Sequence, residues 1–300
     1  MKNKLAITVD VEDWYHLPPF TGAPNSKFKD VPSFFKIWKY RYDYLTKPTF
    51  RILDLLQQYR ITGTFFIVAD VAYYYSGLVE EIARRGHEIA CHGLHHACKI
   101  DPKTKKPLIP PDEFKQRTIL AKSILEQASG KKVIGYRAPN AYIAGWMIDI
   151  LEEIGFRYDS SVCVNSIYNK ADCSLKGISS KPYYPKSGGL EPGNSKRGIL
   201  EIPWPYFSVL LKFPTAGGPA LRMLGARYIK KGLKESLMRG DTIFYFHPID
   251  ISEESFPLNS LTNKIFWMIK GNRVFAEIKE ILSDSEFAKT TCSELLEKAL

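Results

Sequence analysis

Short apolar segments alternate along the chain with longer segments of helical periodicity, and this alternation constrains the fold more than any other feature. We predict that the apolar segments are strands, at residues 5–10, 62–68, 88–91, 132–137, 156–158, 199–202 and 241–247. Their apolar runs are nearly continuous, which is typical of parallel strands covered on both faces. About seven such strands favour an α/β fold built as a barrel of β/α units over an open sheet.

The domain organisation follows from what the chain lacks. It shows no internal repeat and no linker that would divide it. We therefore predict one domain, residues 1–300, with a barrel core over about 4–250 and a helical extension over about 251–300. Within this C-terminal extension we expect helices at 261–282 and 293–299.

Composition limits the partners and the compartment. The formal net charge is +10, but the lysines and arginines are scattered and form no long basic run. We interpret them as a solvated basic surface, and expect no nucleic-acid partner but a peripheral contact with a membrane surface. Five cysteines without a Cys-x-x-Cys pair do not indicate a disulfide framework. The N-terminal apolar run is too short for a signal peptide, so we expect a cytoplasmic protein.

Polar side chains follow the predicted strands at the points where they end. They are Asp10, Glu12, Asp13, His92, His96, Arg137, Asp159 and His247. In a β/α barrel the carboxyl ends of the strands meet on one face, which is the catalytic face. Each residue alone has a structural explanation, such as an aspartate that caps a helix. Five independent strand ends with such side chains favour a common site.

Three of the six histidines lie within the last five residues of the segment 86–96. The front of this segment alternates like a buried strand, and its back is polar and interrupted by glycine. His92 and His96 are four residues apart and would share one face if the turn coils helically. Two imidazoles leave a metal ion under-coordinated, so a carboxylate is also required. The other histidines of this half of the chain receive structural roles: His16, His87 and His95.

The chain resembles the polysaccharide deacetylases, carbohydrate esterase family 4, which have the NodB-homology fold. The matching motifs occur in the family's order, at residues 8–13, 86–96, 136–140, 158–161 and 244–248. The opening Asp-Val-Glu-Asp-Trp, the two glycines at 217–218 and the Phe-His-Pro ending are similar to the branch found with exopolysaccharide gene clusters. The resemblance implies a distorted (β/α)7-type barrel with long loops.

The resemblance also implies a divalent metal ion, usually zinc, and hydrolysis of an N-acetyl, less often an O-acetyl, group on a sugar polymer or its lipid-linked precursor. His92 and His96 with one carboxylate leave open positions on such a metal. That carboxylate is Glu12 or Asp13. Glu12 has the same strand parity as Asp10, whereas Asp13 has the shorter side chain and the family's usual chemistry.

The remaining roles are carried over from the family in the same way. Asp10 would be the general base that takes a proton from water, and Arg137 would hold it ionised. His247 would be the general acid that protonates the departing amine. Asp159 would raise the pKa of His247 and orient its ring. The backbone N–H of Asn140 would help to stabilise the oxyanion.

Two further features concern substrate binding and the competing functions. Trp204 is expected to stack on a sugar ring or to belong to the core. The long loops 17–47 and 163–198 would shape the groove. One alternative is a non-catalytic carbohydrate-binding relative, although the base and the acid are both present. A second is a non-heme iron oxygenase with two histidines and one carboxylate, but those enzymes usually have an antiparallel barrel.

Overall fold

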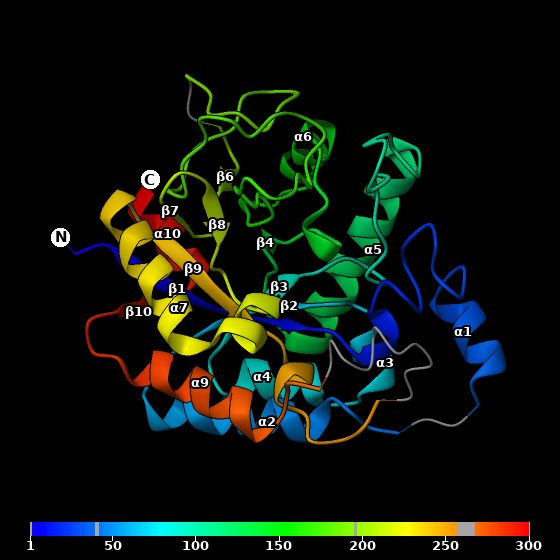
Figure 1. Ribbon diagram of the computed structural model, residues 1–300. Coiled ribbons are helices and arrows are strands. Elements are labelled where there is room, and N and C mark those ends of the chain that lie inside the picture. Colours follow the sequence, from blue (N-terminus) through cyan, green and yellow to red (C-terminus); the bar gives the residue numbers. More distant parts are fainter. Residues whose placement is uncertain (1, 40–41, 195–196, 257–267, 300) are drawn as a thin grey trace.

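The computed structural model describes residues 2–39, 42–194, 197–256 and 268–299. A parallel sheet of eight strands runs through its centre, and helices pack around it (Figure 1). The sheet strands are β1 Lys4–Val11, β2 Thr64–Ile67, β3 Glu88–Cys91, β4 Gly135–Tyr136, β5 Tyr158–Asp159, β6 Leu200–Glu201, β9 Thr242–Phe246 and β10 Ala288–Thr290. The α-helices are α1 Val31–Ile37, α2 Thr46–Gln58, α3 Val71–Tyr74, α4 Leu78–Arg84, α5 Pro111–Ser129, α6 Gly145–Glu153, α7 Pro219–Arg239, α9 Asn272–Ser283 and α10 Cys292–Ala299.

The sheet forms a half-barrel. Strands β1 to β6 follow one another in parallel pairs, and β9 pairs with the free side of β1. Because β9 takes that side along residues 5–9, strands β2 and β10 share the other side of β1. Within the described ranges β6 and β9 do not pair, so the ring stays open there. The predicted α/β class is confirmed, all seven predicted strands are present, and β10 is an addition.

Burial explains why β1 is central. Every residue of this strand after Lys4 is buried, because neighbouring strands flank both of its edges and side chains cover both of its faces. A continuous apolar run is the pattern that such a position requires. The side chains of β1 therefore reach its carboxyl end in a fixed register.

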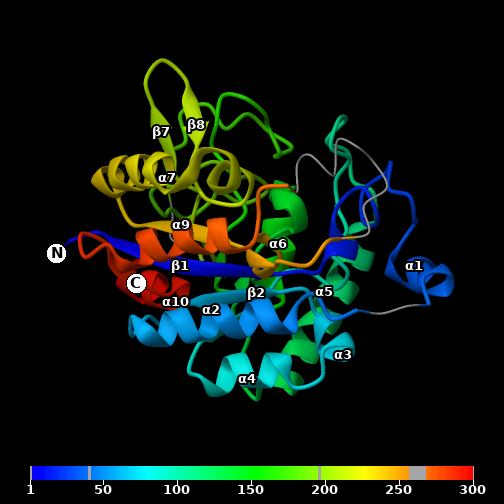
Figure 2. The same ribbon diagram turned by 60° about the horizontal axis from the view of Figure 1, so that its bottom comes forward.

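The C-terminal extension covers the half-barrel at the amino-terminal end of its strands. Strand β10 pairs with the first residues of β1. The backbone N–H of Cys292 donates to Thr64 Oγ1 at 2.9 Å, and that of Ser293 donates to Glu88 Oε2 at 3.1 Å. Thr64 and Glu88 are the first residues of their strands, so α10 covers the end opposite the candidate site. Both chain ends lie on this side of the molecule (Figure 2).

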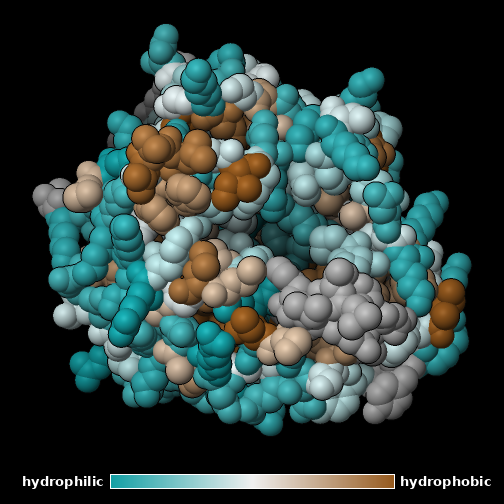
Figure 3. Space-filling view, viewed as in Figure 1, coloured by the Kyte–Doolittle hydropathy of each residue, from teal (hydrophilic) through white to brown (hydrophobic). Residues whose placement is uncertain are grey.

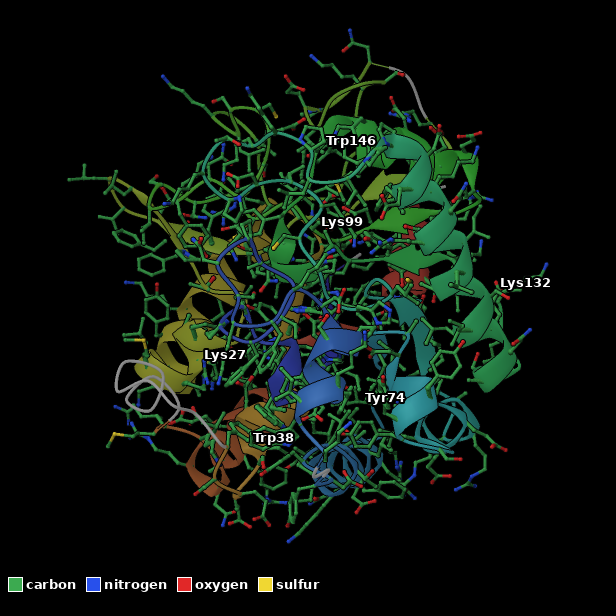
Figure 4. All side chains as sticks on the ribbon, turned by 90° about the vertical axis from the view of Figure 1, so that its right-hand side faces the viewer. Lys27, Trp38, Tyr74, Lys99, Lys132 and Trp146 are labelled. Carbon is green, nitrogen blue, oxygen red and sulfur yellow. The ribbon has the colours of Figure 1, made fainter. Side chains whose placement is uncertain are left out.

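The loop at 17–47 folds onto the carboxyl end of the sheet through an aromatic cluster of its own. Trp14 packs edge-on against Phe20 and Phe34, with ring centroids 4.9 and 5.4 Å apart. Trp38 and Tyr74 lie on the same side of the molecule (Figure 4) and pack against this cluster. Residues 17–39 of this loop therefore form a packed wall, and residues 17–19 reach the cavity described below.

The structure differs from the expected elements in three places. An antiparallel hairpin, β7 Tyr206–Ser208 and β8 Lys212–Pro214, follows the sixth sheet strand. The apolar pattern predicts one helix at 73–85, but two helices, α3 and α4, occupy the region around 71–84. They are separated at Gly77, whose φ of 78° is unsuited to a helix. The helix expected at 261–282 begins at Asn272, after irregular residues 268–271, and residues 257–267 lie outside the described ranges.

Two further findings concern cysteines and membranes. All five cysteines are free thiols. Across the described ranges, every helix is too short or too polar to cross a bilayer.

Candidate active site

A cavity of about 440 Å³ opens where the strands end, and Figure 3 shows the hollow in this face. Seven of the residues selected from the sequence line it: Asp10, Glu12, His92, His96, Asn140, Trp204 and His247. They come from β1, from the turn after β3, from the segments that follow β4 and β6, and from the end of β9. The carboxyl ends of the strands thus meet at one cavity, as expected for a barrel of β/α units.

Glu12, His92 and His96 form a group that could hold a metal ion. One ligand atom from each lies within 4.8 Å of the other two, and all three side chains are buried. His92 Nδ1 lies 2.8 Å from the carbonyl oxygen of Arg137, and His96 Nδ1 lies 3.0 Å from that of His16. A carbonyl oxygen only accepts, so each Nδ1 carries the proton and each Nε2 is free to coordinate.

The electrostatics of this group fit a cation. His96 Nε2 and Glu12 Oε2 are 2.5 Å apart, and this carboxylate oxygen makes no hydrogen bond among the described residues. Two such lone pairs approach closely only where a positive charge, a proton or a metal ion, is shared. Burial lowers the pKa of His92 to about 4, which keeps its imidazole neutral. Burial would raise the pKa of Glu12, but the neighbouring histidines outweigh this and lower it.

The turn that brings the two histidines together is not helical. Residues 92–96 contain no helix, and the two imidazole centroids lie 4.8 Å apart. His96 has a φ of 52° and Gly93 a φ of 80°, both in the left-handed region. A Cβ at Gly93 would lie 3.0 Å from Pro139 Cγ, so the glycine is required by the turn and by this close approach.

Asp13 does not join the group. Its Oδ1 accepts the N–H of Trp14 at 2.7 Å, and its Oδ2 accepts the hydroxyl of Tyr75. It begins the 3₁₀ turn Trp14–His16, and burial raises the pKa of its carboxyl to about 6. Of the two carboxylates left open by the sequence, the structure brings Glu12 to the histidines and directs Asp13 into a cap.

Asp10 is paired with Arg137. Arg137 Nη1 donates to Asp10 Oδ1 at 2.5 Å and to Thr8 Oγ1 at 3.0 Å. The guanidinium is fully buried, its Nε donates to the carbonyl of Ser160, and it lies 3.9 Å from the ring centre of Phe66. A buried arginine held on several sides fixes its carboxylate partner in one orientation.

His247 is oriented by Asp250, and not by Asp159 as expected from the sequence. Asp250 Oδ2 lies 2.8 Å from His247 Nδ1 and also accepts the backbone N–H of His247 at 2.9 Å. Burial opposes the imidazolium, but the charge of Asp250 and its hydrogen bond outweigh this and raise the pKa of His247 to about 9. His247 Nε2 faces the cavity, 3.6 Å from Glu12 Oε1.

Asp159 has a different position because it turns into the strand end. Its Oδ1 accepts the hydroxyl of Ser161 at 2.7 Å, and its carboxyl is hydrogen-bonded to that of Glu201. Ser161 Oγ in turn accepts the backbone N–H of Ala138 at 2.7 Å. Asp159 therefore fixes the segment that carries Arg137 and does not reach His247.

The two residues selected for substrate binding both line the cavity. Asn140 has a φ of 56°, in a short turn after β4. Trp204 is both a cavity wall and a core residue. Its Nε1 donates to the carbonyl of Ser160 at 2.9 Å, and its ring packs 4.5 Å from that of Tyr245.

Several residues that line the cavity, or that contact its lining residues, were not selected from the sequence. Asp250 lies three residues after His247, a spacing that places its carboxylate on the backbone N–H of the histidine, and this signal could have identified it. Arg222 lies 3.4 Å from Asp250 on the same wall. Lys170 and Tyr168 come from the loop 163–198, with the ammonium 5.3 Å from the ring centre of Tyr168. No pattern in an irregular loop indicates which side chains face a site.

Comparisons with known proteins agree with this arrangement. Residues 36–158 match the family model of polysaccharide deacetylases, and residues 166–296 match a domain of unknown function, DUF3473. A peptidoglycan-N-acetylglucosamine deacetylase of Bacillus cereus is 26% identical over 133 residues, or 43% of this chain and 57% of that protein. A peptidoglycan deacetylase of Helicobacter pylori is 27% identical over 117 residues, or 38% of this chain and 37% of that protein.

The chain spans about half the length of these curated relatives or less. Among solved structures, a protein from Mycobacterium smegmatis described as a polysaccharide deacetylase superposes with a TM-score of 0.65. It shares 19% identity, with 99% of this chain and 91% of that chain covered, and therefore shows the fold. The matched domain and the shared fold lead to one conclusion: residues 36–158 of this chain are similar to the polysaccharide deacetylases, and residues 166–296 match DUF3473.

Proposed function

We propose that the chain is a metal-dependent hydrolase that removes acetyl groups, chiefly N-acetyl groups, from an amino sugar of a polysaccharide or of its lipid-linked precursor. One observation carries this proposal. The buried group Glu12, His92 and His96 shares a single cavity with Asp10 and His247. Arg137 pairs with Asp10, and Asp250 pairs with His247. Each of the three units has a separate part in amide hydrolysis.

Glu12, His92 and His96 would hold the metal, for which zinc suits two imidazoles and one carboxylate best. Such an ion, when bound, lowers the pKa of water and polarises a carbonyl group. The protein prepares the site by keeping His92 neutral and by fixing both imidazoles through backbone carbonyls. These second contacts orient the ligands.

Asp10 would accept the proton of the attacking water, because Arg137 holds its carboxylate in a fixed position at the edge of the cavity. His247 would donate a proton to the departing amine nitrogen from Nε2. Its pKa is raised to about 9, so the imidazolium is populated at neutral pH. The backbone N–H of Asn140 would support the oxyanion, and Trp204 would form a wall for the sugar ring.

The experiment is acetate release from an acetylated chito-oligosaccharide, with and without a chelator. We expect release to stop on chelation and to return with zinc. A requirement for oxygen and a keto acid would instead indicate the oxygenase, and sugar binding without turnover would indicate a non-catalytic relative.

The variant Asp10→Asn tests the base. We expect it to lose turnover and to keep its metal, because asparagine preserves the shape but does not accept the proton. The control is Asp112→Asn, an exposed position in the first turn of α5, which should behave like the parent. Near-normal turnover of Asp10→Asn would exclude Asp10 as the base.

A further inference from the structure

Large apolar side chains are exposed together on the face that carries the cavity. They come from the tip of the hairpin β7–β8, the start of α7 and the adjoining loop. We call this set the apolar rim, and its members with their exposed fractions are Ile167 62%, Val209 72%, Leu210 96%, Leu211 52%, Met223 63% and Leu224 54%. Figure 3 shows apolar side chains gathered over β7, β8 and α7, beside the hollow.

The hairpin that carries the rim is firmly built, so the exposure of its tip is not the result of a loose loop. The rings of Phe207 and Phe213 stack across the two strands at 5.3 Å, and Tyr228 of α7 packs edge-on against Phe207 at 5.3 Å. Ser166 and Lys212 exchange two hydrogen bonds of 2.9 Å, which tie the loop next to Ile167 to the hairpin. A rigid element that presents aliphatic side chains to water is typical of a docking surface.

The hairpin and α7, which carry most of the rim, are rich in cations. Residues 206–239 contain seven lysines and arginines but only one acidic residue, Glu235. Some of the cations of α7 are paired, for example Lys230 with Asp284 at 2.8 Å. Lys212, Arg227 and Lys231 have no carboxylate within ion-pair distance among the residues that the structure describes; these three carry uncompensated charge.

We propose that the apolar rim docks on the surface of an anionic lipid bilayer. The tip of the hairpin would enter the boundary between headgroups and acyl chains, and the flanking cations would face the lipid phosphates. A bilayer fits better than a second copy of the chain. The tip is convex, and two copies with a net charge of +10 would bring like charges together.

The position of the rim gives the docking a consequence for the cavity. Tyr168 and Arg222 line the cavity. The rim residue Ile167 directly precedes Tyr168, and the rim residue Met223 directly follows Arg222. A protein seated on the rim would therefore hold the mouth of its cavity at the lipid surface. Such a position suits a sugar substrate that is attached to a membrane lipid. The docking itself does not depend on the proposed hydrolysis.

Sedimentation of the whole chain with lipid vesicles tests the proposal. We expect binding to vesicles of phosphatidylglycerol and phosphatidylethanolamine, weaker binding at high salt, and little binding to phosphatidylcholine alone. The variant with Val209→Ser, Leu210→Ser and Leu211→Ser should reduce the partition coefficient at least about tenfold, because its side chains no longer gain from leaving water. The matched control is Ile37→Ser, which is 71% exposed on α1, at the opposite side of the view in Figure 1.

The outcomes separate the proposal from its rivals. Loss of vesicle binding in the hairpin variant, with the control unchanged and both variants melting like the parent, supports docking. Equal binding of the hairpin variant and the parent overturns it, as does a parent that binds no vesicles. A parent that self-associates through the hairpin without binding lipid would show that the rim is an interface between copies. Acetate release from a soluble oligosaccharide should stay unchanged in the hairpin variant, so failure of docking and failure of hydrolysis remain distinguishable.

Discussion

The adjacent carboxylates of Glu12 and Asp13, just after β1, point in opposite directions, and the geometry of the strand explains why. Side chains alternate along a strand, so Glu12 points to the same side as Asp10 and reaches the cavity. Asp13 points away and caps the turn that follows. The difference is one of direction, since both side chains are buried.

The first prediction uses this pair. Glu12→Gln should lose bound metal, because an amide oxygen is a weaker ligand than a carboxylate. Asp13→Asn should keep its metal and lose about 1 kcal/mol of unfolding free energy, because its contacts with Trp14 and Tyr75 are weakened. Elemental analysis and urea unfolding of both variants check the two halves. Metal loss in Asp13→Asn with full retention in Glu12→Gln would reverse the assignment.

The second prediction concerns the partner of His247. Asp250→Asn removes the nearby charge, so burial dominates and the pKa of the imidazole falls. The general acid then loses its proton at lower pH, so the alkaline limb of the pH–rate profile shifts to lower pH. We expect kcat to fall about tenfold or more. Asp159→Asn is the comparison, and it should leave that limb in place because Asp159 bonds Ser161. If the alkaline limb shifts in Asp159→Asn and not in Asp250→Asn, then Asp159 is the residue that raises the pKa of His247.

The residues that the sequence identified are those whose positions are fixed by regular strands. Asp10, His92 and His247 each end a strand, and a strand end has a known location in a barrel. Lys170 belongs to an irregular loop, and no periodicity indicates where its side chain points. Asp159 does end a strand, but its assigned partner was wrong, because the strand fixes the position of the residue and the local contact with Ser161 fixes the direction of its carboxylate.

At the level of elements, the ends of β5 and β6 are joined by the neighbouring carboxyl groups of Asp159 and Glu201. Burial raises the pKa of Glu201 well above its ordinary range, and Asp159 raises it further. Glu201 Oε1 also accepts the backbone N–H of Val162 at 3.0 Å. The pair therefore links the ends of β5 and β6. Ser160, the residue after β5, accepts hydrogen bonds from Arg137 with its carbonyl and its hydroxyl oxygen, so this link also supports Arg137.

The third prediction follows from the sign of that shift. The folded protein keeps a proton on this pair above pH 4.5, where an unfolded glutamate has lost it, so folding takes up a proton and stability falls as pH rises. Glu201→Gln keeps both hydrogen bonds and removes the titration. Its advantage in unfolding free energy over the parent should grow by up to about 1.4 kcal/mol per pH unit above pH 5. Urea unfolding at several pH values checks this, and a constant difference would contradict a retained proton.

The strands were predictable where a buried apolar run marks them. The seven buried strands have apolar runs that identify them. The tip of the hairpin β7–β8, Val209–Leu211, is apolar as well, but it lacks the glycine or asparagine that marks a tight turn, and so it was not identified. Strand β10 is three residues long, and its pairing with β1 is a long-range contact that no local pattern encodes.

At the scale of the whole molecule, the candidate metal group joins segments that are distant in the sequence. Glu12 follows β1, whereas His92 and His96 follow β3, and β2 lies between these strands. Among the described residues, this is the one cluster of three or more histidine, cysteine or acidic side chains that could hold an ion. A metal bound there would link the open half-barrel across its carboxyl end.

The fourth prediction is that removal of the metal lowers the melting temperature of the whole chain. A ligand at a hundred times its Kd contributes about 2.7 kcal/mol, and about 1 kcal/mol corresponds to 2–4 °C in a chain of this size, so we expect a decrease of about 5–10 °C. The control is Glu12→Gln, which should melt at one temperature with and without chelator, because it no longer holds the ion. Elemental analysis of the parent must show that the metal has been removed. If the melting temperature is then unchanged, the ion does not link these strands. An equal decrease in the parent and in Glu12→Gln would mean that the chelator acts elsewhere on the protein.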